Sequence, residues 1–218
     1  MLRNVDLSEI SDGKLYDAND MVKADCKGCE GCSACCRGMG KSIILDPLDV
    51  HRLTTGLGVP FEALLSQHVE LNVVDGLILP NLRMTEGADA CPFLNEQGRC
   101  SIHAYRPGIC RLFPLGRFYE NDSFRYFLQV HECPKPSKAK IKVYKWLDTD
   151  DIRTYEQFIS DWHYFLKALQ ERIAGMEDQA QIRSTCMYVL QQFYLAPCED
   201  FYEAFHGRLD EAKRYFEM

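Results

Sequence analysis

Apolar residues recur at intervals of three and four through the last third of the chain. Over residues 152–173 this spacing predicts one long amphipathic helix that ends at Gly175. The same spacing predicts a second helix over 178–195 and a third over 199–216, with Pro197 ending the second. The aromatic side chains on these three helices are expected to form a hydrophobic core.

The region before these helices has shorter apolar runs. Asp46 followed by Pro47 is typical of a helix N-cap with proline at the first helical position, and the pair predicts a helix over 47–55. A second helix is expected over 60–71, with glycines separating it from the first.

Other short apolar runs predict strands, and the polar first 25 residues predict an extended lead-in segment. The strands are expected at 42–45, 73–84, 124–130 and 141–146. The sequence therefore predicts an α+β fold in which a small cysteine-rich region of short strands and helices precedes three helices. The predicted divisions are 1–25 for the lead-in, 26–147 for the cysteine-rich domain and 148–218 for the helical segment packed on it.

Charge and hydropathy exclude two classes of partner. The formal net charge is −7 and the pI is near 5.4, without the basic stripe that a nucleic-acid-binding protein requires. No apolar run approaches the roughly 20 residues needed to span a membrane. Residues 1–14 lack the apolar core of a signal peptide, so the expected location is the reducing cytoplasm.

Eleven cysteines change this ordinary picture. Their odd number and the expected reducing compartment favour metal ligands over disulfides. Cys186 and Cys198 fall among the helical segments and are expected to be small buried thiols rather than ligands. The other nine are the predicted metal ligands: Cys26, Cys29, Cys32, Cys35, Cys36, Cys91, Cys100, Cys110 and Cys133.

The first cysteines have the spacing of a metal-binding loop. Four of them stand at every third position from Cys26 to Cys35, with small residues between several of them, and Cys36 follows directly. The spacing of Cys26, Cys29, Cys32 and Cys36 is that of the bacterial ferredoxin motif C-x₂-C-x₂-C-x₃-C-P, with Arg37 in place of the final proline.

The number of cysteines is compatible with more than one kind of metal site. Eight of the nine would fill two tetrathiolate sites, each a [4Fe–4S] cluster or a Cys₄ zinc, with Cys26 as a spare thiol. Structural zinc sites usually have two short C-x₂₋₄-C pairs, whereas Cys91, Cys100 and Cys110 are 9 and 10 residues apart. This spacing favours one or two [4Fe–4S] clusters, with zinc as the alternative.

Four separated motifs of the chain resemble the cysteine-cluster proteins of YkgJ type. These motifs are CEGCSACCR, ILDPLDV, CPFL and GRCSIHAYRPGICRLFP, and together they cover about residues 26–134. The family is described as zinc- or iron-chelating, and the flagellin lysine N-methylase is grouped with it. The resemblance implies that Cys133 and the cysteines from Cys29 to Cys110 are ligands, and by analogy it implies use of S-adenosylmethionine.

Four charged residues near the cysteines are candidates for binding the cofactor. His103 could ligate metal or donate to a cluster sulfur, or it could be a packed histidine. Arg37, Arg106 and Arg111 could donate N–H bonds to thiolate or sulfide, or grip a substrate carboxylate. The alternative for these arginines is a purely structural ion pair.

Two kinds of function fit these features. The first is an enzyme, either a cluster-dependent methyltransferase acting on protein lysine or an oxidoreductase, for which no catalytic residue can be assigned. The second is a non-catalytic electron or metal carrier, or a zinc-stabilised interaction domain. The expected partner is accordingly a protein substrate or a redox partner. No Gly-rich loop follows a strand, so a Rossmann site for S-adenosylmethionine is not expected.

Overall fold

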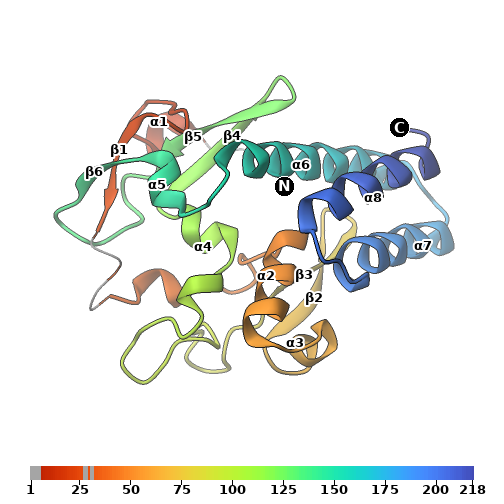
Figure 1. Ribbon diagram of the computed structural model, residues 1–218, viewed down its shortest axis with the longest axis horizontal. Helices are drawn as coiled ribbons and strands as arrows, with labels where there is room; N and C mark the ends of the chain where they lie inside the picture. Colours follow the sequence, from red (N-terminus) through yellow and green to blue (C-terminus); the bar gives the residue numbers. More distant parts are fainter. Residues whose placement is uncertain (1–5, 27–28, 30–31) are drawn as a thin grey trace.

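The α+β prediction is confirmed by a computed structural model, which describes residues 6–26, 29 and 32–218 (Figure 1). Within these ranges the strands form three antiparallel pairs: β1 with β6, β2 with β3, and β4 with β5. The cysteine-bearing loops lie at one end of the molecule and the three long C-terminal helices at the other.

The three C-terminal helices are confirmed nearly to the residue. They are α6 (Ile152–Ala174), α7 (Gln179–Val189), which continues as the π-helical turn η3 (Leu190–Leu195), and α8 (Phe201–Tyr215). Each begins at an aspartate whose side chain accepts hydrogen bonds from backbone N–H groups of the first turn, which would otherwise lack partners. These N-caps are Asp151, Asp178 and Asp200.

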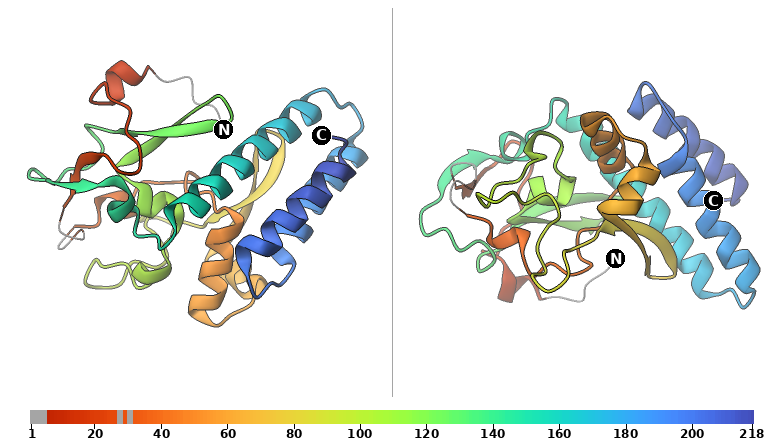
Figure 2. Two further views of the ribbon diagram at one scale, coloured as in Figure 1. Left: turned by 45° about the horizontal axis from the view of Figure 1, so that its top comes forward. Right: turned by 90° about the horizontal axis from the view of Figure 1, so that it is seen from below.

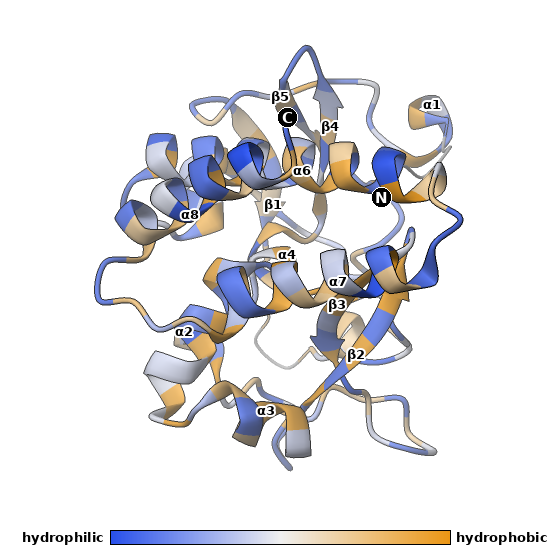
Figure 3. Cartoon of the chain, turned by 90° about the vertical axis from the view of Figure 1, so that its right-hand side faces the viewer, coloured by the Kyte–Doolittle hydropathy of each residue, from blue (hydrophilic) through white to orange (hydrophobic). Residues whose placement is uncertain are grey.

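Aromatic side chains join these helices into one core, as the sequence predicts. The ring of Phe158 on α6 lies 4.7 Å from that of Phe205 on α8, and Trp162 lies 5.0 Å from Phe193 on η3. Figure 2 shows α6 and α8 running side by side, and Figure 3 shows hydrophobic and hydrophilic residues alternating along the helices. Each such aromatic pair adds about 0.5–1.5 kcal/mol beyond its buried area.

The first predicted helix is α2 (Pro47–Leu57), and its start is held by a capping box. Asp46 accepts from the backbone of Asp49, and Asp49 accepts from the backbone of Asp46. Gly58 ends the helix in the left-handed conformation (φ 67°), which glycine adopts without steric cost.

Two expectations for the following segment are wrong. The helix predicted over 60–71 ends early, as α3 (Phe61–Gln67), because its last residues pair in the hairpin of β2 (Val69–Val74) and β3 (Leu77–Leu82). Residues 42–45 are not a strand, since Ile44 makes only an isolated bridge to Asn81. Tertiary pairing overrides local pattern at both places.

The remaining strands are short. The strand predicted over 124–130 is β5 (Ser123–Leu128), which pairs with β4 (Leu115–Glu120), a strand that the sequence pattern does not reveal. The strand predicted over 141–146 is mostly wrong, because β6 (Ala139–Lys142) gives way to the helix α5 (Val143–Leu147).

The expected lead-in contains ordered elements. Its short helix α1 (Leu7–Ile10) and its strand β1 (Met21–Asp25) are both defined, and β1 pairs with β6. The N-terminal segment is therefore built into the cysteine-rich half through a contact that spans more than 110 residues of sequence.

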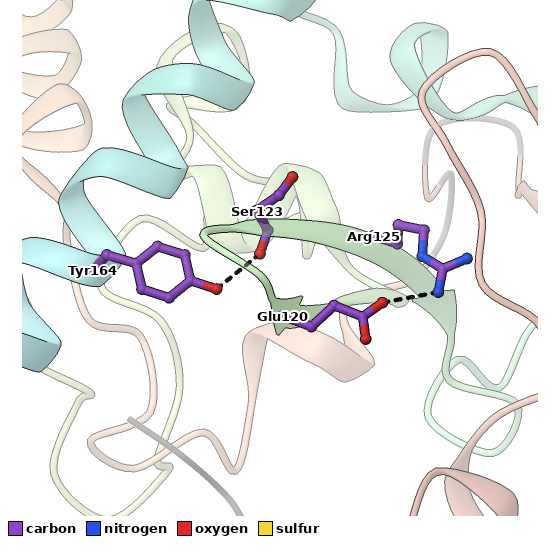
Figure 4. A network of polar contacts seen from close by, with 4 residues as sticks. All are labelled: Glu120, Ser123, Arg125 and Tyr164. Atoms are coloured by element: carbon purple, nitrogen blue, oxygen red, sulfur yellow. Dashed lines mark hydrogen bonds and ion pairs between the residues drawn. The ribbon is translucent and has the colours of Figure 1, made fainter.

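Polar contacts fix the tip of the β4–β5 hairpin against α6 (Figure 4). The Tyr164 hydroxyl donates to the carbonyl of Ser123 at 3.1 Å, and Arg125 pairs with Glu120 at 2.9 Å. The Ser160 hydroxyl donates to the carbonyl of Asp122 in the same turn at 2.8 Å. These contacts set the register between the hairpin and the helix.

Among the described residues, no helix has both the length and the apolar character needed to cross a bilayer.

Candidate metal centre

Hydrogen bonds between loops bring the distant cysteines together. The turn η1 (Ala34–Cys36) carries two cysteines, and the backbone N–H of Cys91 donates to the carbonyl of Cys36 at 2.7 Å. An isolated bridge between Arg37 and Ala90 continues this pairing, and another joins Leu94 to Cys100. Loops 55 residues apart in sequence thus lie side by side at this end of the molecule.

A cavity of about 740 Å³ opens between these loops and β4. Of the described residues, seven predicted ligands line it, and they come from the first cysteine loop, from the 91–100 loop and from α4 (Gly108–Leu112). These are Cys29, Cys32, Cys35, Cys36, Cys91, Cys100 and Cys110.

The other two predicted ligands lie at the edge of this group. The Sγ atom of Cys26 lies 3.5 Å from that of Cys29, although Cys26 does not itself line the cavity. Cys133 follows Glu132, which does line the cavity, and its carbonyl accepts from Lys138 at 3.0 Å. All eleven cysteines fall among the described residues, and each is a free thiol.

The thiols in the cavity differ in acidity. The hydrogen bond between the side chains of Cys35 and Cys36 lowers the pKa of Cys36 and raises that of Cys35. Burial, followed by the neighbouring Cys26, raises the pKa of Cys29 to about 12. Burial also raises the pKa of Cys110, with a further contribution from Asp49. In the absence of metal, Cys36 is therefore the thiol best placed to be a thiolate.

The donor set of the cavity suits a soft metal. Thiolates select zinc and iron–sulfur clusters over hard cations such as magnesium. Within the described part of the chain, no three ligating side chains are close enough to hold one metal ion as they stand. The residue types that line the cavity nevertheless fit the predicted metal or cluster.

Arg106 is the cation most closely associated with the sulfurs. It lines the cavity, and its positive charge lowers the pKa values of Cys29, Cys35 and Cys100, partly offsetting the effect of burial. His103, at the start of η2 (His103–Tyr105), also lines the cavity and is exposed.

The other two predicted cofactor-binding residues lie outside the cavity lining. Arg37 is exposed next to Cys36. Arg111 is only 2% exposed, and its Nη1 donates to the carbonyls of Leu147 and Asp148 at 3.3 and 3.2 Å. These bonds tie α4 to the end of α5, which is a structural role. Donation to a cluster sulfur stays a prediction for both arginines.

The buried carboxyl group of Asp49 positions α4, whereas the sequence pattern identifies only its neighbour Asp46, as a helix cap. The Oδ1 atom of Asp49 accepts from the backbone N–H of Gly108 at 2.6 Å, where α4 begins two residues before Cys110. Burial and the neighbouring Asp46 raise the pKa of Asp49 to about 8. The signal in the sequence is the repeated aspartate in Asp-Pro-Leu-Asp, but nothing local shows that both are buried.

The far end of the cavity has different chemistry. Arg117, Phe118 and Tyr119 of β4 line it together with His163 of α6. The rings of Tyr119 and His163 stack, with centroids 3.5 Å apart and planes 6° from parallel. No pattern in the sequence connects these residues, since β4 itself is not recognisable.

The two C-terminal cysteines lie away from this cavity. Cys186 is buried, as expected, and its Sγ lies 3.6 Å from the carbonyl oxygen of Gly76. Cys198 is half-buried with its Sγ 3.6 Å from the Nδ1 of His51.

Comparison with known proteins identifies a family. The family model CxxCxxCC, described as a "putative zinc- or iron-chelating domain", matches residues 28–143, which include every cavity-lining cysteine. No curated protein and no solved structure matches the chain significantly.

Proposed function

This chain belongs to the CxxCxxCC family of zinc- or iron-chelating domains, and we propose that its thiols bind iron–sulfur clusters used in a reaction on a small molecule. The observation that carries the proposal is the convergence of seven cysteines from three segments on one cavity. One tetrathiolate site accounts for four of these sulfurs, so the remainder support a second site or an incompletely ligated one.

Two features favour iron–sulfur clusters over zinc. The ferredoxin-like spacing from Cys26 to Cys36 is the first. The second is the separation of Cys91, Cys100 and Cys110 by 9 and 10 residues, since structural zinc sites usually have two short C-x₂₋₄-C pairs. When bound, a cluster supplies one-electron chemistry or an iron site that is open to a ligand.

The size of the cavity favours a substrate over a closed electron carrier. A volume of about 740 Å³ is within the range of about 300–1,000 Å³ typical of small-molecule sites. This chain's own residues would exclude bulk water there and orient the bound molecule beside the thiols. Methylation of protein lysine and use of S-adenosylmethionine stay predictions from the family resemblance alone.

The test is metal and acid-labile sulfide analysis of protein purified without oxygen, with Mössbauer spectroscopy. About four irons and four sulfides per chain are expected for one cluster and about eight of each for two. Stoichiometric zinc without sulfide, retained after anaerobic reconstitution with iron and sulfide, would contradict the proposal and support a zinc-stabilised domain.

A further inference from the structure

Arg117, which lines the cavity, has a buried N–H donor that lacks a partner among the described residues. Its Nη2 donates to the Tyr155 hydroxyl at 2.7 Å, and its Nε is buried without a hydrogen-bond partner. Within the described residues no carboxylate forms an ion pair with it, and Asp46 acts on it only at longer range. Leaving a buried guanidinium donor unpaired is unfavourable, so the site has capacity for an acceptor.

Aromatic rings surround this guanidinium. It lies over the ring of Phe124 at 5.5 Å and that of Tyr155 at 5.7 Å, which fixes its plane. The stacked pair of Tyr119 and His163 also lies in the cavity wall, and Tyr119 is on the same face of the β4–β5 hairpin as Arg117. The guanidinium therefore lies in a part of the cavity wall that is rich in aromatic rings.

We propose that Arg117 and the aromatic wall of Tyr119 and His163 bind a small planar aromatic carboxylate, with its ring directed along the cavity toward the thiols. The planar fork of an arginine matches a carboxylate, and the rings match a flat apolar body. A carboxylate fits better than a phosphate, because among the described residues that line this end Arg117 is the one permanent cation.

The inference deepens the proposed function, since the bound molecule would lie in the cavity that the metal centre shares. The carboxylate site and the iron–sulfur assignment can still be disproved independently of each other. Binding of the carboxylate is measured directly, whereas the identity of the metal is settled by iron, sulfide and zinc content.

The experiment is calorimetric titration of the anaerobically prepared protein with 2-naphthoate and with its neutral amide, 2-naphthamide. Naphthoate is expected to bind in a 1:1 ratio and at least about tenfold more tightly than the amide, because only the carboxylate pairs with Arg117. Equal affinity for the two compounds in the unmodified protein, or no saturable binding of naphthoate, would overturn the inference without any variant.

Variants then locate the site. Arg117→Met is expected to reduce naphthoate affinity at least about tenfold and to remove the preference over the amide, while Arg117→Lys restores part of that preference. Arg125→Met removes an exposed arginine from the same hairpin and is the matched control, with affinity expected to be unchanged. Unchanged naphthoate affinity in a folded Arg117→Met protein would place binding elsewhere and overturn the inference.

Discussion

At the scale of single residues, the thiols that line the cavity are distinguished by their surroundings. Cys36 has a lowered pKa because Cys35 hydrogen-bonds to it, and its backbone carbonyl accepts from Cys91. Cys186 has the same side chain but lies in the core, far along the sequence from the motif. Identical residue types therefore have different expected roles.

Replacement of Cys36 by serine should remove a metal ligand. We expect metal affinity to fall by more than about tenfold, since loss of a supporting residue next to a ligand already costs about 10–100-fold. The measurement is metal content after gel filtration at a fixed free metal concentration. Cys186→Ser is the control and should retain full content, and equal retention by both variants would contradict the assignment of Cys36.

A second prediction concerns His163. Burial, with a further effect from Lys167 and Arg117, lowers its pKa to about 4. When the pKa of a histidine is lower in the folded state than in the unfolded state, its contribution to the stability of the fold is fully present above about pH 6.5. That contribution is lost as the pH falls from about 6.5 to 4.

The variant His163→Phe keeps a ring against Tyr119 and removes the titrating group. Between pH 7 and pH 5, the free energy of unfolding in urea should fall by up to about 1 kcal/mol more for the wild type than for the variant. The effect is limited because His163 is half-exposed. His131→Phe, at an exposed position, should leave the pH dependence of the wild type unchanged. Parallel pH curves for wild type and His163→Phe would show that the histidine is not stabilised in its neutral form.

At the scale of elements, the first turn of α2 and the first turn of α4 depend on each other. Asp49 caps its own helix and accepts from Gly108 of α4. A Cβ atom at Gly108 would lie 3.0 Å from the Tyr155 hydroxyl, so glycine permits this close approach. The arrangement places Cys110 against the cavity.

Removal of the bond between Asp49 and Gly108 should destabilise the protein more than removal of an ordinary helix cap. We expect Asp49→Ala to lower the free energy of unfolding by about 2–4 kcal/mol, from a lost cap and an unpaired buried N–H group. Asp151→Ala should lower the free energy of unfolding less, because it removes only the solvent-exposed N-cap of α6 and leaves no buried N–H group unpaired. Urea unfolding of both variants measures the difference, and equal losses would mean that the bond to Gly108 contributes little.

The helices and strands also show where the local sequence pattern is sufficient to predict secondary structure. The helices α6, α7 and α8 are predicted from spacing because each has a long amphipathic repeat and an aspartate cap. The end of α3 and the existence of β4 are not predicted, because both depend on pairing with a partner strand. Short runs of six residues fit a helix or a strand equally well until such a partner is present.

At the scale of the whole molecule, metal binding is expected to hold the cysteine loops together. Over residues 32–46 and 83–114 the regular elements are at most five residues long, so few contacts of their own fix these loops. The C-terminal helices, by contrast, are long and joined by aromatic contacts in the hydrophobic core. Without metal, the cysteine loops should therefore be less stable than the C-terminal helices.

Removal of metal with a chelator tests this expectation. A metal present at 100–1,000 times its Kd stabilises by about 2.7–4.1 kcal/mol, so its removal should lower the Tm by about 5–15 °C. Limited proteolysis should then cut first within residues 85–101, leaving the C-terminal helices protected. Cys36→Ser, if it binds little metal, should show a smaller drop in Tm, and cleavage that began in α6–α8 would contradict the expected order.

The sequence by itself determined the α+β class, the three C-terminal helices and the set of cysteines, because these follow from local spacing and residue type. Only the tertiary structure decided that seven of those cysteines, among the described residues, line one cavity. It also decided that Arg111 bonds to backbone carbonyls outside that cavity, while Arg117 lines the cavity with Tyr119 and His163. The reason is physical: spacing reports on neighbours within a few residues, whereas a cavity is formed by segments that meet through long-range hydrogen bonds and packing.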